Sequence, residues 1–256
     1  MIWPALTAVL LIARLPYTFN DRKMGRRQAV YYVLVLLMGL AILKINTTWY
    51  ALAALTIVLI LFTLITEWRA DGLKSWRLIS LGTAVLAYRL LTGTMSPLEI
   101  NPAVSSLVQN LGQNFPPAGN LIQDPAFRQT ALVIGAGYLL QLTEANLIVR
   151  TLLDALDFSP DPGSQTGLPA AAQVNPTVIS DDYQAGRVIG ILERSFAYLA
   201  IITGRPSIFG FILAAKAFAR FKEMDNKAYA EYVLIGTMAS VFLALISAEL
   251  VLLLTS

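Results

Sequence analysis

Charged side chains interrupt the apolar segments that end this chain. Residues 184–256 are predominantly apolar, yet they contain Glu193, Arg194 and Lys216. A charge near the centre of a membrane helix costs roughly 2.5–3.5 kcal/mol on insertion scales, so such residues usually face a protein interior or a water-filled cavity. The sequence therefore predicts a membrane protein whose last helices pack around an internal charge cluster.

The composition also indicates a membrane protein. Apolar residues make up 56% of the chain and charged residues 14%, whereas soluble domains average roughly 45–50% and 25%. The net charge is +3, and the basic residues are scattered between apolar segments, which is typical of membrane topology and not of a nucleic-acid surface. The absence of cysteine and histidine excludes thiolate and imidazole chemistry, including most metal and haem ligation. We therefore expect a non-enzymatic protein without a cofactor or a bound metal.

Apolar segments of nearly membrane-spanning length recur along the chain. A span needs about 20 mostly apolar residues, and this criterion predicts an all-α, polytopic bundle of about eight transmembrane helices, within a range of roughly six to eight. Residues 1–19 form either a first span or an uncleaved start segment. The expected segments are residues 2–12, 30–43, 49–66, 78–92, 132–153, 188–203, 208–221 and 229–254.

Basic residues indicate which connections lie in the cytoplasm. With an even number of spans, nearly all basic groups fall on one side of the membrane. Lysine and arginine are enriched in cytoplasmic loops, so this side is expected to be the cytoplasm. The connections assigned to it are residues 15–28, 67–77, 151–187 and 220–228.

Two long connections divide the chain. Both contain many prolines, and the second also contains glycines, residues that oppose helices and central strands. Residues 93–128 are expected to form an external lid or docking loop, and residues 159–183 a cytoplasmic linker, with plain connectors as the alternative for both. The predicted organisation is an N-terminal membrane unit of about five spans at 1–158, and a C-terminal bundle of about three spans at 184–256.

Helix geometry brings the charges of the last segments to similar depths. At a rise of about 1.5 Å per residue, Glu193 and Arg194 reach the same level as Lys216 on the next, antiparallel segment. We expect Glu193 to pair with Lys216 or Arg194, and the surplus positive charge to attract an anionic lipid headgroup, an anionic ligand or an acidic partner segment. The alternative is that these residues snorkel and fix helix register. The cluster consists of Arg187, Glu193, Arg194, Lys216, Arg220 and Glu231.

Small residues and two further polar residues complete the candidate sites. Glu144 and Asn146 lie inside the fifth expected segment, and Glu144 is the best single candidate for a proton-linked or ion-linked role. Small residues three or four positions apart let two helix backbones approach closely. They recur at Gly186, Gly190, Gly210, Ala214, Gly236 and Ser240.

Three runs of sequence in this region resemble a known family. The runs are residues 185–194 (AGRVIGILER), 208–223 (IFGFILAAKAFARFKE) and 230–237 (AEYVLIGT). Together they resemble the C-terminal signature of a bacterial membrane family catalogued as domain of unknown function 3307, whereas residues 1–130 diverge from it. The resemblance implies a multi-pass protein of the bacterial inner membrane and selects the six cluster charges as motif residues. The family has no established activity.

Functions of different classes compete for this sequence. The leading hypothesis is an accessory or scaffold subunit whose partners are membrane lipids and other membrane subunits, with no nucleic acid. The alternative is a transporter or channel for a small ion or anion, centred on the charge cluster and Glu144. A membrane enzyme ranks last, because the chain has no histidine, no compact acidic motif and no glycine-rich phosphate loop.

The predicted topology leads to a labelling test. Cysteines introduced at Gly72 and Pro162 are expected to react from the same, cytoplasmic side, because both lie in connections assigned to that side. Impermeant maleimide labelling of cells and of inverted vesicles measures this without background, since the chain has no cysteine of its own. Labelling of the two variants from opposite sides would contradict the topology.

Overall fold

The regular elements in the part of the chain that the structure describes are helices. The computed structural model describes residues 3–18, 24–69, 73–94, 99–106, 110, 124–156, 176–219 and 227–255. Within these ranges the only pairing of the strand type is one isolated bridge between Leu43 and Ile100. The all-α prediction is confirmed. The described helices form two compact units, Met1–Thr143 with Leu254–Ser256, and Glu144–Leu253.

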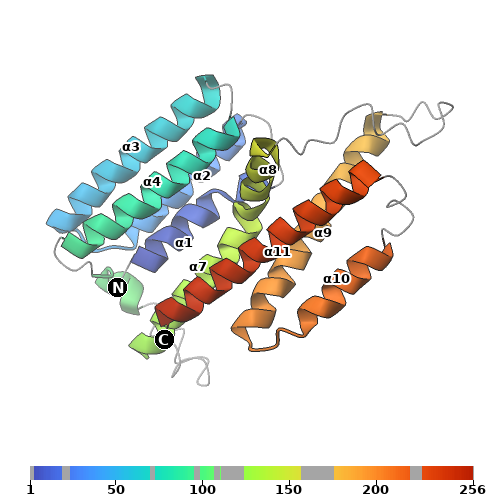
Figure 1. Ribbon diagram of the computed structural model, residues 1–256. Helices are drawn as coiled ribbons and strands as arrows, with labels where there is room; N and C mark the ends of the chain where they lie inside the picture. The colour runs from blue at the N-terminus through green and yellow to red at the C-terminus, as the bar shows by residue number, and fades with distance from the viewer. Residues whose placement is uncertain are drawn as a thin grey trace. The chain divides into compact units, whose positions relative to one another are not determined.

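Each apolar segment expected from the sequence contains a helix (Figure 1). The fifth expected segment contains two, α7 and α8. The helices are α1 (Trp3–Ala13), the 3-10 helix η1 (Leu15–Thr18), α2 (Arg26–Ala41), α3 (Thr47–Arg69), α4 (Leu73–Thr94), α7 (Pro125–Thr143), α8 (Ala145–Ala155), α9 (Pro176–Ile202), α10 (Ile208–Ala219) and α11 (Lys227–Thr255).

Two of the described helices are long and apolar enough to cross a membrane, Thr47–Trp68 in α3 and Leu234–Thr255 in α11. The consecutive helices Ala126–Thr143 and Ala145–Leu153 meet the same criterion only when they are taken together as one broken span. Helices α1 and α10, with 11 and 12 residues, fall short of the ~20 residues that a span needs. The described helices thus fit a membrane bundle with two or three crossings by length and composition, and the count of eight stays a prediction.

The first unit is organised around α1. Helix α1 packs against α2, α4 and α7, and α3 packs against α2 and α4. Leu6, Leu10 and Leu11 of α1 are buried in a core shared with Tyr32 of α2 and Leu52 of α3. A helix with neighbours on several sides is apolar on several faces, which explains why the sequence of α1 reads as a candidate membrane segment.

Part of the expected external loop, residues 93–128, is fastened to the connection between α2 and α3. The backbone N–H of Lys44 donates a hydrogen bond to the backbone carbonyl oxygen of Glu99 at 2.8 Å, and the backbone N–H of Asn101 donates one to the carbonyl oxygen of Ile42 at 2.8 Å. The Lys44 ammonium also pairs with the Glu99 carboxylate at 2.6 Å. This hydrogen bond and charge hold the pKa of Glu99 below its ordinary value.

In the second unit, a tight turn returns the chain alongside α9. The N–H of Gly204 donates to the Ile201 carbonyl oxygen at 2.9 Å, and the N–H of Arg205 donates to the Ala200 carbonyl oxygen at 2.7 Å. These two bonds form a Schellman motif, and the proline that follows, Pro206, cannot continue the helix. Helix α10 therefore packs back against α9.

The break between α7 and α8 corrects one part of the sequence prediction. Residues 132–153 were expected to form one continuous span, but α7 ends at Thr143 and Glu144 lies in a turn. The Thr143 hydroxyl donates back to the Leu139 carbonyl oxygen at 2.8 Å, and hydroxyl bonds of this kind bend helices. The two compact units divide at the same point, and α8 lies in the second of them; the predicted division into membrane units at 1–158 and 184–256 stays a prediction.

The start of α9 differs as well. Residues 176–183, predicted to be the end of the 159–183 linker, are the first turns of this helix. Helix α9 begins at Pro176, and proline suits the first helical position because the N–H that it lacks would have no partner there. The rest of the predicted linker lies outside the described residues.

Two glycines of the second unit are expected to respond oppositely to the same substitution. Gly204 has φ of 69°, a conformation that costs other residues roughly 1–2 kcal/mol, so Gly204→Ala should lower the free energy of unfolding by about that amount. Gly210 is helical with open space around it, so Gly210→Ala should raise the free energy by about 0.5–1 kcal/mol. Unfolding in detergent measures both. Equal effects would contradict the role of the Gly204 turn.

Candidate functional site

An ion pair between Glu193 and Lys216 joins α9 to α10. The Lys216 Nζ lies 2.6 Å from Glu193 Oε2, and both side chains are mostly buried. The turn at Gly204 sets this contact, because each residue lies roughly 12–14 Å along its helix from the turn. Of the two partners expected for Glu193, the structure selects Lys216.

Arg194 lies next to this pair in sequence but points to a different helix. Its Nη1 donates a hydrogen bond to Ser240 Oγ of α11 at 3.2 Å, and its side chain is buried. A Cβ at Gly190, one turn earlier on α9, would lie 3.4 Å from the same Nη1. The missing side chain of Gly190 therefore leaves room for the Arg194 guanidinium.

The other predicted cluster residues do not share one environment. Arg187 is buried on α9, and Glu231 is exposed near the start of α11. Arg220 lies outside the described residues. Glu144 is fully buried at the break between α7 and α8, and Asn146 is half-buried in α8.

The stripe of small residues on α11 faces a helix contact, as predicted. A Cβ at Gly236 would lie 3.6 Å from Leu153 Cδ1 of α8, and Ser240 is buried against the Arg194 side chain. The stripe on α9 has another role, because Gly190 accommodates a side chain of its own helix. Gly186 lies in α9, but its surroundings are outside the described contacts.

The stripe on α10 does not form the predicted close contact. Gly210 and Ala214 are exposed, and a Cβ at Gly210 would meet nothing within 4 Å. Helix α10 is instead half-buried along a neighbouring face, at Phe209, Ile212, Leu213 and Lys216. Larger side chains make this contact, so the small residues are left on the outside.

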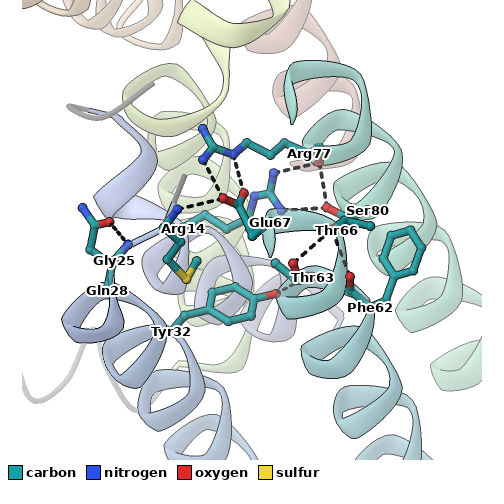
Figure 2. A network of polar contacts seen from close by, with 11 residues as sticks. Arg14, Gly25, Gln28, Tyr32, Phe62, Thr63, Thr66, Glu67, Arg77 and Ser80 are labelled. Atoms are coloured by element: carbon teal, nitrogen blue, oxygen red, sulfur yellow. Dashed lines mark hydrogen bonds and ion pairs between the residues drawn. The ribbon is translucent and has the colours of Figure 1, made fainter. Parts of the chain in front are cut away.

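A second polar site, which the sequence analysis missed, lies in the first unit (Figure 2). Arg77 of α4 holds Glu67 of α3 by two parallel bonds, from Nε to Oε1 at 2.6 Å and from Nη2 to Oε2 at 3.0 Å. The N–H of Met24, just before α2, donates to Glu67 Oε2 at 3.0 Å. Arg14, just after α1, donates to the Arg77 carbonyl oxygen at 2.8 Å and to Ser80 Oγ at 3.0 Å. One buried network thus joins the end of α1, the start of α2, and helices α3 and α4.

The reason for the omission is the position of Glu67. Glu67 directly follows the apolar segment 49–66, so the sequence suggests a carboxylate exposed to water at the end of that segment. Arg77 was likewise assigned to a basic cytoplasmic connection. The useful signal is their spacing in sequence: Glu67 lies near the end of α3 and Arg77 near the start of α4, and the two helices pack against each other.

The chemistry of both sites is that of charge pairing between helices. In the described part of the chain, no three acidic side chains come together as a metal-binding group. No family model, no curated protein and no solved structure matches the chain. The resemblance to domain of unknown function 3307 therefore stays a prediction, and function must be argued from the residues.

Three ion pairs of different burial lead to a ranked prediction. The exposed fractions of the paired side chains are 6% and 1% for Arg77–Glu67, 18% and 15% for Lys216–Glu193, and 52% and 62% for Lys44–Glu99. Replacing Glu67 and Glu193 by Gln should lower the free energy of unfolding by about 3–5 and 1–3 kcal/mol, and Glu99→Gln should have the smallest effect of the three, because an uncompensated charge costs more when it is buried. Thermal and chemical unfolding in detergent tests this order.

A second substitution supplies the control for the Glu193 pair. In Glu193→Gln, the ammonium of Lys216 is left without its carboxylate, so adding Lys216→Met should recover part of the lost stability. If Glu193→Gln is as stable as the parent, the pair is solvated and does not fix the register of α9 and α10.

Proposed function

We propose that this chain is a non-enzymatic, multi-pass protein of the bacterial inner membrane that acts as an accessory or scaffold subunit of a larger assembly. Its partners are other membrane subunits and membrane lipids, with anionic headgroups at the cytoplasmic ends of its helices. The proposal includes about eight membrane segments, because each expected apolar segment contains a helix, and it counts α1 and α10, which are shorter than a full span. The observation that carries it is the outer face of α10.

Helix α10 has an aromatic outer face that no described part of the chain covers. Phe211 is 76% exposed and Phe218 is 86% exposed. Residues three, four and seven positions apart share one side of a helix, so these two side chains lie on one face together with Ile208, which is also exposed. Exposed apolar surfaces of this kind mark contacts with another protein or with a membrane.

The length of α10 favours a protein partner on this face. Twelve residues make a helix of roughly 18 Å, whereas the hydrocarbon core of a bilayer is about 30 Å thick. A helix of this length does not reach across the hydrocarbon by itself, so lipid alone does not account for its aromatic face. A helix of a neighbouring subunit would cover that face.

The described ion pairs support a packing role. Glu193–Lys216 joins α9 to α10, and Glu67–Arg77 joins α3 to α4. The long apolar helices offer further outward surface, since only 33% of the most apolar stretch of each of α3 and α11 is buried. These two ion pairs therefore hold helices together within a unit, and the exposed apolar surface is available for contact with neighbouring subunits.

Transport of a small ion or anion is the second candidate, and the break at Glu144 favours it. This residue is fully buried at the point where α7 and α8 separate. Interrupted helices at membrane depth supply the ion and substrate sites of many transporters. The scaffold role ranks higher because it accounts for the exposed aromatic face of α10, which transport does not explain.

Site-specific photo-crosslinking from α10 tests the scaffold role. A photoreactive amino acid at Phe211 or Phe218 should give one stoichiometric protein adduct of reproducible mass in native membranes, because both side chains face outward. Ile212 is the matched control on the inner face of the same helix and should give only links within the chain. Lipid adducts alone at both outer positions would contradict the proposal.

A further inference from the structure

Helix α3 of the first unit reverses the distribution of side chains that a helix facing water has. From Tyr50 to Trp68, the exposed side chains are all apolar or aromatic. Thr56, Thr63 and Glu67, by contrast, are almost completely buried. A helix with water on one side places its polar residues on that side, so the outer face of α3 is built for an apolar neighbour.

The threonine hydroxyls of α3 are used inside the first unit. Thr63 Oγ1 lies 3.3 Å from the hydroxyl of Tyr32 in α2, and Thr56 Oγ1 lies 3.4 Å from the hydroxyl of Tyr88 in α4. The hydroxyl of Thr66 donates to a carbonyl oxygen of its own helix at 2.9 Å. These three hydroxyls are therefore satisfied within the unit, and the outer face keeps its apolar character.

Aromatic side chains mark both ends of this face. Tyr50 is 63% exposed and Trp68 is 71% exposed. At a rise of about 1.5 Å per residue they lie roughly 27 Å apart along the helix, close to the ~30 Å thickness of the hydrocarbon core of a bilayer. Tyrosine and tryptophan are enriched at both interfaces of a membrane, where their rings sit at the level of the headgroups. The exposed side chains between the two are Ala54, Ile57, Val58, Leu61 and Ile65.

The flanking charges complement lipid headgroups. A backbone N–H just before α2 donates to Glu67, which places the start of α2 beside the end of α3. Arg26 and Arg27 begin α2 and are exposed, and basic residues at a membrane surface attract anionic headgroups. The sequence has no charged residue between Arg27 and Lys44, or between Lys44 and Glu67. Charge is thus confined to the two ends of this pair of helices.

We propose that the outer face of α3 contacts the hydrocarbon chains of membrane lipids, with Tyr50 at one interface and Trp68 at the other. An exposed apolar face meets either lipid or another subunit, and the composition of this one selects lipid. Contacts between membrane helices favour small and hydroxyl-bearing residues, whereas this face consists of branched apolar side chains apart from Ala54. The inference rests on the membrane location proposed above, and it leaves α10 as the face for a partner subunit.

The neighbouring face of α4 is not included, because a charge interrupts it. Arg89 is exposed, and its guanidinium lies 6.0 Å from the centre of the Trp3 ring at the start of α1. An arginine in this position extends its charged end toward the membrane surface. The surface that we assign to lipid is therefore that of α3 alone.

Spin labels on the full-length protein in vesicles of phosphatidylethanolamine and phosphatidylglycerol test the depth of this face. The label of a Leu61→Cys variant should be mobile and should collide with oxygen but not with a water-soluble nickel complex, because it lies in hydrocarbon. Labels of Tyr50→Cys and Trp68→Cys should collide with both reagents, because they lie at the interfaces. The chain has no cysteine of its own, so each label reports on one position.

Leu52 supplies the matched control on the opposite side of the same helix. It is fully buried, so the label of a Leu52→Cys variant should be immobile and reached by neither reagent. If this variant does not fold, Leu59→Cys replaces it, because Leu59 is also buried in the core of the unit. If Leu61→Cys does not fold, Val58→Cys on the exposed face serves instead.

Photo-crosslinking in native membranes decides between lipid and protein as the neighbour. A photoreactive amino acid at Leu61 should give lipid adducts and no protein adduct. An adduct with another protein, or with a second copy of the chain, would overturn the lipid assignment and leave the membrane location intact. Collision of the Leu61 label with the nickel complex would overturn both for α3. Neither result depends on crosslinking from α10, so failure of this inference and failure of the scaffold role are distinguishable.

Discussion

The first unit depends on the bidentate contact between Arg77 and Glu67. Glu67 lies in the last turn of α3, where the helix dipole disfavours a negative charge, and it is almost completely buried. Such a carboxylate is tolerated only with strong donors, and it receives three, two from Arg77 and one from the backbone of Met24. Arg14 extends the network to the end of α1. A slip of any of these helices by one turn would leave a charge buried without a partner, so the network fixes register.

This network also accounts for the central position of a helix too short to span a bilayer. Helix α1 ends at Ala13, directly before Arg14, and other helices of the unit surround it. A helix covered by protein has no lipid boundary to match, so its length is set by its neighbours. The apolar character of residues 2–12 therefore reflects burial among helices, which hydropathy alone cannot distinguish from exposure to lipid.

Helix positions and one ion pair were predictable from the sequence, because each depends on local geometry. Apolar runs located the helices, and the helical rise placed Glu193 level with Lys216. The Glu67 network was not predictable in the same way, since it joins four helices whose packing no local pattern specifies. The stripe at Gly210 and Ala214 was misread for a related reason: small residues permit close packing, but the larger side chains of the neighbouring face decided which side of α10 meets α9.

The two units differ in how their buried arginines are compensated, and this difference has a thermodynamic consequence. In the first unit, Arg77 is paired with Glu67 of the same chain, so its stabilisation is present whenever the unit folds. In the second unit, Arg194 donates one hydrogen bond to Ser240 Oγ, and among the described residues its Nε and Nη2 have no hydrogen-bond partner. Burying an ionised group costs free energy when its donors are not all paired, so the buried arginine of the second unit is expected to contribute less to stability than Arg77 contributes to the first unit.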